Sequence, residues 1–188
     1  MALEDLPYCY REPQSDWEPL TTAFFNRPAI EVAPDLIGTY LSHETEDGFK
    51  ALQISEIEIY SGTHDTASHA SRGITKRTSV MYESAGTFYV YLCYGIHTMF
   101  NIITGGHGEP EGILIRACIG AEGPGKLTRA LGLTPAYHGL CLEDTPEIRF
   151  WTDGTTYPYT TGRRIGISYA DKVDRERLWR YILTRPEP

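Results

Sequence analysis

The stretch "TYLSHETEDGFKALQISEIEIY", residues 39–60, decides the fold. Two runs in which apolar and polar residues alternate lie on either side of Glu46, Asp47 and Gly48. Alternation with a period of two is typical of strands that bury one face, and acidic residues followed by glycine are typical of a hairpin turn. The segment therefore predicts two antiparallel strands joined by a tight turn.

Further strands are predicted on the C-terminal side of this hairpin. "TFYVYLCYGIHTMFN", residues 87–101, indicates a second hairpin that turns at Gly95. "GILIRACIG", residues 112–120, is typical of a buried strand, and "RRIGISYA", residues 163–170, predicts another strand. "DRERLWRYIL", residues 174–183, is a mixed terminal segment. Strands therefore dominate the chain.

Two short helices accompany these strands. "AFFNRPAIEVAPDLIGTYL", residues 23–41, predicts a helix that Pro34 opens and that closes near Gly38. "GPGKLTRALGL", residues 123–133, predicts a second helix, with Gly132 as its stop.

The remaining segments are irregular. Residues 1–20 predict an irregular N-terminal arm, and residues 61–86, which are small, polar and poorly periodic, predict a long loop with one helical turn. The expected fold class is α+β: a single-domain, mostly antiparallel β roll or sandwich over residues 21–188, with short helices and a protruding hairpin.

Composition limits the class of protein. A chain of 188 residues with 41% hydrophobic residues is long enough for one compact domain and too short for two ordinary ones. The N-terminus has no apolar core of a signal peptide, and no stretch approaches the roughly 18 apolar residues of a membrane span, so a cytoplasmic protein is expected. No cysteines form a CxxC pair, which favours free thiols over a zinc ribbon or disulfide framework. The four cysteines are Cys9, Cys93, Cys118 and Cys141.

The charge is strongly acidic. A formal net charge of −8 argues against indiscriminate nucleic-acid binding, because that affinity comes mainly from neutralising phosphates. A short basic cluster, Arg72, Lys76 and Arg77, nevertheless interrupts the polar loop. It is either a local anion-binding face or an ordinary solvated cluster.

The segment "EIEIY", residues 56–60, is the first candidate for chemistry. Strand alternation places Glu56, Glu58 and Tyr60 on one face and the isoleucines on the other. A partly desolvated carboxylate beside an aromatic ring is a suitable general base for activating water, and a second carboxylate nearby raises one of the two pKa values. The alternative is an ordinary solvent-facing strand.

Two other motifs fail as cofactor sites. In "HDTASHAS", His64 and His69 are five positions apart, which does not place them on one helix face as metal ligands, so no metal is expected. "GAEGPGKLT" differs from a nucleoside triphosphate loop because Leu127 stands where a hydroxyl must bind magnesium. Gly125 and Lys126 at a helix start remain suited to holding a single phosphate. We expect no cofactor.

The second hairpin concentrates tyrosines. Tyr89 and Tyr91 share one face of the strand, whereas Tyr94 falls in the turn, where its own hairpin cannot bury it. A protruding ring is either an interface or folded-over tip residue, or a wedge of the kind that minor-groove proteins insert between stacked bases.

Taken together, five motifs resemble the alkyladenine (3-methyladenine) DNA glycosylase family in order and spacing. They are "EIEIY", "SHASRG", "GTFYVYLCYGIHTMFN", "GILIRA" and "GPGKLTRALGL". The likeness covers Phe24 to Leu133, with a weaker echo at "RRIGI", Arg163 to Ile167. The resemblance implies that residues 21–188 form a single DNA glycosylase domain.

The resemblance also implies a base pocket and its catalytic group. Glu58 matches the family's general base, which activates the attacking water. Tyr60 and Tyr91 match the rings that sandwich an extruded base, His69 matches the residue that closes the pocket, and Asn101 matches the side chain that screens the base edge.

The resemblance extends to contacts with DNA. Tyr94 matches the hairpin-tip residue that intercalates into the minor groove, and Arg116 matches an arginine near the catalytic water and the DNA backbone. The candidate phosphate contacts are Arg72, Lys76, Arg77, Lys126 and Arg164.

The expected activity is that of a monofunctional glycosylase in base excision repair. It extrudes alkylated or otherwise damaged purines from duplex DNA and leaves an abasic site, and no lysine stands in place of Glu58 for a Schiff-base lyase step. Duplex DNA is the expected partner and a nucleoid-associated monomer the expected state. The rival functions are lesion binding without turnover, hydrolysis of free nucleosides, and an interaction domain with an aromatic edge.

Two features depart from the family pattern. The net charge of −8 and Thr78-Ser79 in "SRGITKRTSVMY" bear on DNA affinity and on the search for lesions more than on the chemistry.

The family resemblance also sets a condition on the second hairpin. If Tyr91 and Asn101 both face one pocket, a two-residue turn would place them on opposite faces of the hairpin, whereas a three-residue turn over Tyr94 to Ile96 places them on the same face. An odd-length loop or a bulge is therefore predicted there.

Overall fold

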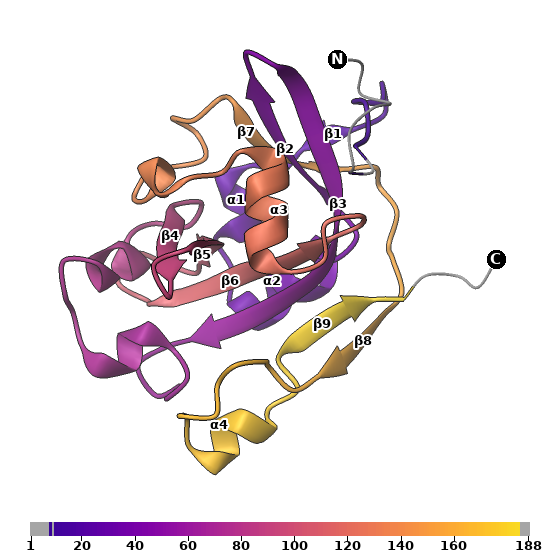
Figure 1. The fold of residues 1–188 in the computed structure, drawn as a ribbon. Helices are drawn as coiled ribbons and strands as arrows, with labels where there is room; N and C mark the ends of the chain where they lie inside the picture. Colours follow the sequence, from indigo (N-terminus) through magenta and orange to yellow (C-terminus); the bar gives the residue numbers. More distant parts are fainter. Residues whose placement is uncertain (1–7, 9, 185–188) are drawn as a thin grey trace.

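A computed structural model describes residue 8 and residues 10–184 of the chain (Figure 1). Within this part, nine strands pair antiparallel throughout in one open sheet of order β1-β7-β2-β3-β6-β5-β4, and β9 joins β3 to β8. The strands are β1 Glu18–Pro19, β2 Tyr40–Thr45, β3 Gly48–Ser61, β4 Phe88–Cys93, β5 His97–Thr104, β6 Glu111–Cys118, β7 Ile148–Thr152, β8 Tyr159–Gly162 and β9 Arg180–Leu183. The α+β class with a mainly antiparallel sheet is confirmed.

Short helices fill the connections. The α-helices are α1 Thr22–Phe25, α2 Ala29–Leu36, α3 Pro124–Leu131 and α4 Lys172–Glu176, and the 3₁₀ turns are η2 His69–Arg72, η3 Thr78–Tyr82 and η4 Pro135–Tyr137. α2 and α3 contribute Val32, Leu36, Leu127 and Leu131 to the same fully buried core as the strand residues. This packing leaves the loop 61–86 and α4 on one side of the molecule (Figure 1).

Both predicted hairpins are present. Thr45 pairs with Gly48 across a two-residue turn, and Gly48 has a φ of +108°, which only glycine adopts readily. In the second hairpin Cys93 pairs with His97, so that the loop has three residues and Tyr94 takes a left-handed φ of 51°. The predicted odd-length loop is confirmed.

Two predicted elements are wrong in detail. The first helix begins after Pro28, and Pro34 lies inside it instead of opening it. Because Pro34 stands in the last turn, its missing N–H removes only one hydrogen bond near the helix end. Residues 163–170 form a loop and no strand. The Ile165 N–H, a backbone donor that a strand ladder would use, bonds Glu58 instead, and the side chain of Arg164 bonds the Ile59 carbonyl.

Two further predictions concern the loop 61–86 and the end of α3. The long loop 61–86 carries two 3₁₀ turns, η2 and η3, where one was expected. The stop of α3 at Gly132 is confirmed, since this residue caps the helix with a left-handed φ of 71°.

The described part of the N-terminal arm packs on the domain. Trp17 stacks on Tyr40 with 4.0 Å between ring centroids, and Tyr10 Oη donates to the Ala130 carbonyl at 2.7 Å. Residues 1–7, and Cys9 with its predicted free thiol, lie outside the described residues. Cys93, Cys118 and Cys141 are free thiols. In the described ranges no helix has the length and apolarity needed to cross a bilayer.

Candidate active site

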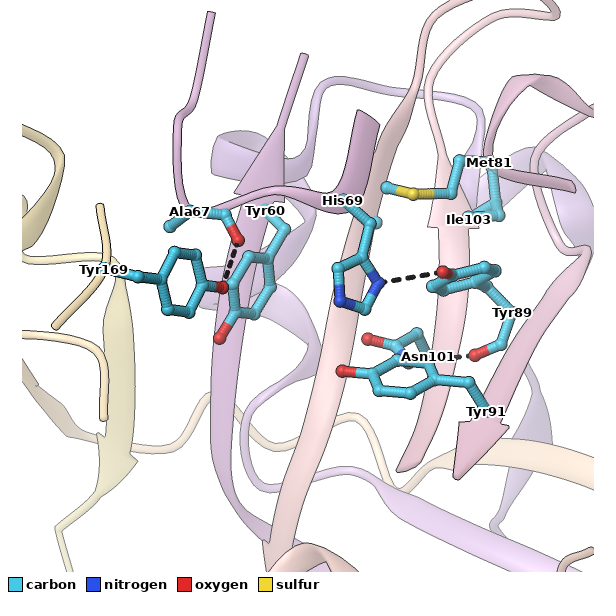
Figure 2. Close-up of a pocket in the computed structure, with 10 residues that line it drawn as sticks. Tyr60, Ala67, His69, Met81, Tyr89, Tyr91, Asn101, Ile103 and Tyr169 are labelled. Atoms are coloured by element: carbon cyan, nitrogen blue, oxygen red, sulfur yellow. Dashed lines mark hydrogen bonds between the residues drawn. The ribbon is translucent and has the colours of Figure 1, made fainter. Parts of the chain in front are cut away.

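A pocket opens between the second half of β3, the β4–β5 hairpin, the loop 61–86 and the loop 163–170. Figure 2 shows Tyr60 and Tyr169 on one side and His69, Tyr89 and Tyr91 on the other. Its lining residues are Tyr60, Ala67, His69, Met81, Tyr89, Tyr91, Asn101, Ile103, Gly112 and Tyr169. The pocket is thus walled mainly by aromatic rings, and its tyrosines, His69 and Asn101 also bring polar groups to the lining.

The hairpin register brings the β4 and β5 side chains together. Because Cys93 lies opposite His97, Tyr89 lies opposite Asn101 and Tyr91 opposite Met99, on one face of the ribbon. Asn101 is buried, and its Nδ2 donates to the Tyr89 carbonyl at 2.9 Å. Tyr91 and Asn101 therefore line the same pocket, as the three-residue loop predicted.

His69 stands against the rings of β4. Its Nδ1 shares a hydrogen bond of 2.9 Å with Tyr89 Oη, and its ring centroid lies 4.8 Å from that of Tyr91. Burial, together with the nearby cations Arg77 and Arg72, lowers the pKa of His69 from 6.5 to about 4. The imidazole is therefore neutral at physiological pH.

Glu58 is the fully buried carboxylate beside this pocket. Its side chain has 0% exposure, and two donors reach it: Tyr60 Oη at 2.9 Å from Oε2 and the Ile165 N–H at 2.7 Å from Oε1. Arg116 Nη1 lies 3.6 Å from Oε2. Burial raises the Glu58 pKa above its ordinary value of 4.5, and these three partners oppose the rise. The result is a desolvated carboxylate held in one orientation.

Two bulges aim the charged groups of this region. Between β3 and β6 the register shifts once on either side of Glu56, because Ile54 pairs with Cys118, Glu56 with Ala117 and Ile57 with Ile115. Arg116 is thereby an extra residue on its strand, and its Nε bonds Glu56 at 3.0 Å. Glu56, whose role the sequence left open, thus holds the arginine that faces Glu58.

The expected phosphate contacts divide into two groups. Arg164 is wrong in this role: its side chain has 0% exposure and pairs with Asp65, so no phosphate reaches it. The other four, Arg72, Lys76, Arg77 and Lys126, are exposed. The guanidinium of Arg72 lies 5.5 Å from the Tyr169 ring centroid and that of Arg77 lies 5.8 Å from the Tyr91 centroid, beside the pocket.

Of the remaining residues, Tyr94 protrudes as predicted, whereas Tyr89 and Tyr169 are pocket residues that the sequence missed. Tyr94 is 92% exposed at the hairpin tip and takes no part in the pocket lining. Tyr89 lines the pocket, and its alternation with Tyr91 was a usable signal. Tyr169 also lines it, but no signal marked a tyrosine in a loop that was expected to be a strand. Among the described residues no group of three His, Cys, Asp or Glu side chains is arranged to hold a metal.

Comparison with known proteins identifies related sequences over most of the chain. The family model for methylpurine-DNA glycosylase matches residues 23–120 and 119–187. A Myxococcus xanthus protein is 41% identical over 176 residues, covering 85% of this chain and 89% of its own length. A Psychrobacter cryohalolentis protein is 38% identical, covering 86% and 90%, and a Bacillus velezensis protein is 35% identical, covering 89% and 94%. All three bear the name of a 3-methyladenine DNA glycosylase.

Proposed function

The chain belongs to the methylpurine-DNA glycosylase family, and on that premise we propose that it excises damaged purines from duplex DNA by hydrolysis. The proposed enzyme is monofunctional: it releases the free base and leaves an abasic site for base excision repair. Its proposed substrates are 3-methyladenine and 7-methylguanine, together with hypoxanthine and ethenoadenine. The proposed working form is a monomer on duplex DNA.

The observation that carries the proposal is the buried carboxylate of Glu58 next to an aromatic pocket. In the proposed step a water oxygen attacks C1′ of the sugar while Glu58 accepts a proton from that water. The electron pair of the C1′–N bond leaves with the base. An N3- or N7-alkylated purine carries a positive charge, so it departs neutral and needs little help from an acid. For these cationic lesions one base catalyst then suffices.

The pocket walls suit such a purine. We assign Tyr60 to one face of the base and Tyr91 with His69 to the other, with Asn101 at its edge. Electron-rich rings favour a cationic base by about 1–2 kcal/mol when desolvated. His69 supports this selectivity because its lowered pKa, about 4, keeps a competing positive charge out of the pocket.

Access to the base requires extrusion from the helix, since C1′ is shielded inside the stack. We assign Tyr94 to the gap left by the nucleotide, because its ring is 92% exposed on a protruding turn. Inserted rings offset part of the few kcal/mol lost on unstacking. Among the residues that the structure describes, no lysine lines the pocket, which supports a hydrolytic step without a Schiff base.

The test is release of bases from methylated duplex DNA by the wild type, Glu58→Gln and the exposed-carboxylate control Glu83→Gln. We expect release by the wild type and the control, and a loss of at least about 100-fold in Glu58→Gln. If the wild type releases no base, the proposed glycosylase activity is wrong. If Glu58→Gln releases as much base as the wild type, Glu58 is not the general base. Lesion binding without release supports a lesion-binding protein, and cleavage of free methylated nucleosides supports a nucleoside hydrolase.

A further inference from the structure

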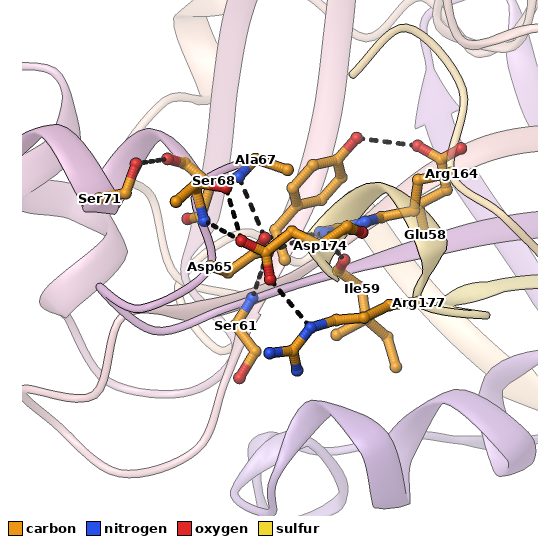
Figure 3. A network of polar contacts seen from close by, with 12 residues as sticks. Glu58, Ile59, Ser61, Asp65, Ala67, Ser68, Ser71, Arg164, Asp174 and Arg177 are labelled. Carbon is orange, nitrogen blue, oxygen red and sulfur yellow. Dashed lines mark hydrogen bonds and ion pairs between the residues drawn. The ribbon is translucent and has the colours of Figure 1, made fainter. Parts of the chain in front are cut away.

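A buried ion pair lies behind the pocket, outside its lining. Arg164 Nη1 and Nη2 bond the two carboxylate oxygens of Asp65 at 2.6 and 2.8 Å, and both side chains are at most 1% exposed (Figure 3). Nη1 also donates to the Ile59 carbonyl at 2.8 Å. Asp65 in turn accepts from the Ala67 N–H at 3.1 Å and the Ser61 N–H at 3.3 Å. The pair therefore joins the end of β3, the loop 61–86 and the loop 163–170.

Arg164 controls two of the groups that reach Glu58. The next residue in the chain, Ile165, donates its N–H to Glu58 at 2.7 Å. The Arg164 guanidinium also lies 4.8 Å from the ring centroid of Tyr60, whose hydroxyl is the second donor to Glu58. Arg164 thus adjoins both donors, although Arg164 itself does not bond Glu58.

Stability alone does not explain this pair. Burying two charges costs several kcal/mol each, and apolar residues of similar volume often do as well or better. The pair does provide a fixed geometry, because a bidentate guanidinium–carboxylate contact allows one orientation. This geometry sets the backbone of a loop that has no strand partner of its own between residues 163 and 170.

We propose that Arg164, held by Asp65, is a positioning residue for the reaction, which fixes the Ile165 N–H and the Tyr60 hydroxyl on Glu58. This inference rests on the proposed function. Other charged groups lie around Glu58 and are not substituted in the test of this proposal. They are Arg116 on β6, Glu56 on β3 and Arg180 on β9.

The test compares Arg164→Gln and Asp65→Asn with the matched control Arg27→Gln. Arg27 also pairs with an aspartate, Asp35, at 2.9 Å and lies 5.0 Å from the Phe24 ring centroid. Its polar contacts in the described part of the chain, with Asp35 and the Phe24 carbonyl, share no residue with the Arg164–Asp65 network. Single-turnover release and lesion-DNA affinity are measured against pH. Where Arg164→Gln does not fold, Arg164→Lys replaces it.

We expect a fall of about 10–100-fold in the release rate of the two test variants, with affinity for lesion DNA within about threefold of the wild type. The acid limb of their rate profile moves to higher pH, because fewer donors reach the ionised Glu58. The control variant is expected to keep the acid limb of the wild-type rate profile. An acid limb that does not move in the test variants, or the same changes in Arg27→Gln, overturns the proposal. NMR titration of the Glu58 carboxyl tests it without activity, so it remains decisive even where the proposed function fails.

A separate surface observation carries a second proposal. A groove beside α4 is lined by three exposed cations, Arg163, Lys172 and Arg175, against one carboxylate, Glu176. Within the described ranges these three cations join no ion pair, in a chain with 25 acidic and 17 basic residues. Unpaired cations gathered in an acidic protein indicate an anionic ligand.

The groove adjoins the pocket through one loop. Arg163 and Ile167 border the groove, whereas Tyr169 of the same loop lines the pocket. On the far side of Tyr169 lies Arg72 of the loop 61–86. We propose that this groove binds a phosphodiester of the strand that carries the damaged base, where Arg163, not its buried neighbour, supplies the phosphate contact. This proposal also rests on the proposed function.

The test is binding of undamaged duplex DNA as a function of salt, which requires no catalysis. Lys172→Gln/Arg175→Gln removes two groove charges, and Arg11→Gln/Lys50→Gln removes two charges near the start of β3. Log affinity falls with log salt, and each lost phosphate contact makes this slope shallower by about 0.9. We expect the slope of the groove variant to be shallower by about 1–2 and that of the control to be unchanged. Equal slopes in the two variants overturn the groove, whereas no DNA binding by the wild type overturns the proposed function itself.

Discussion

The phenol of Tyr60 donates a hydrogen bond of 2.9 Å to Oε2 of Glu58, two residues earlier on β3. The period of the strand places both side chains on one face, so that a wall of the pocket and its buried carboxylate form one unit. Burial and the adjacent Glu58 raise the pKa of Tyr60 well above its ordinary value of 10.0. The hydroxyl therefore keeps its proton and remains a donor at every physiological pH.

Replacing Tyr60 by phenylalanine is expected to separate stacking from hydrogen bonding. The ring stays, but Glu58 loses a donor to its ionised form, so its pKa rises and the acid limb of base release moves to higher pH. Measurement of single-turnover release from methylated DNA against pH checks this. Tyr89→Phe, which removes the hydroxyl next to His69, is the control and leaves the limb in place. An unmoved limb in Tyr60→Phe means that this bond does not set the protonation of Glu58.

The raised pKa of Glu58 also predicts a stability effect. Above pH 4.5 the unfolded chain ionises this carboxyl more readily than the folded protein does, so its contribution to folding falls as pH rises through the folded-state pKa. Glu58→Gln removes this penalty. Urea unfolding of variant and wild type is expected to show a stability gain for Glu58→Gln that grows from pH 4 toward neutral pH. A stability difference that does not change with pH contradicts a raised pKa of the buried Glu58 carboxyl.

His69 predicts the opposite trend. Its folded pKa of about 4 lies below the ordinary 6.5, so the unfolded chain binds the proton first and stability falls as pH drops from 6.5 toward 4. The full loss is on the order of 2–3 kcal/mol. NMR titration of the His69 ring is expected to give a midpoint near 4, and His69→Gln is expected to flatten the pH dependence of unfolding over this window. A midpoint near 6.5 contradicts the desolvated site.

Tyr94 is expected to matter for activity and not for folding. Its side chain is 92% exposed, and its left-handed φ of 51° suits glycine better than tyrosine. Tyr94→Gly should therefore leave the unfolding free energy unchanged or raise it by up to about 1 kcal/mol. Release of damaged bases from duplex DNA should fall, and release from single-stranded DNA, which needs no extrusion from a stack, should change much less. An equal fall on both substrates contradicts the wedge.

Gly38 predicts a large cost for a single methyl group. It has a φ of +88°, and a Cβ there would lie 2.4 Å from the Tyr157 ring. Gly108 has a similar φ of +92° but nothing within 4 Å, so Gly108→Ala measures backbone strain alone, about 1–2 kcal/mol. Gly38→Ala should cost about 1–3 kcal/mol more. Equal losses in urea unfolding show that the ring moves aside freely.

Local sequence determined much of the fold and part of the site. Alternation and turn residues predicted both hairpins, and the same alternation placed Glu58 with Tyr60, whereas the resemblance implied that Tyr91 and Asn101 share one pocket. The three-residue loop over residues 94–96 followed from requiring one shared face. These features depend on neighbours within a few positions, because the period of a strand is set by its own backbone.

The tertiary structure alone decided how the carboxylate is held. The bond from Ile165 to Glu58 spans 107 positions, and the pair of Arg164 with Asp65 spans 99. No local period encodes such contacts, so "RRIGISYA" resembled a strand and Arg164 a surface cation. The bulge that turns Arg116 toward Glu58 and the place of Tyr169 in the pocket likewise depend on which distant segments meet. Sequence thus identified the candidate residues, and packing between remote segments set their orientation and burial, because both depend on contacts that no single stretch of chain contains.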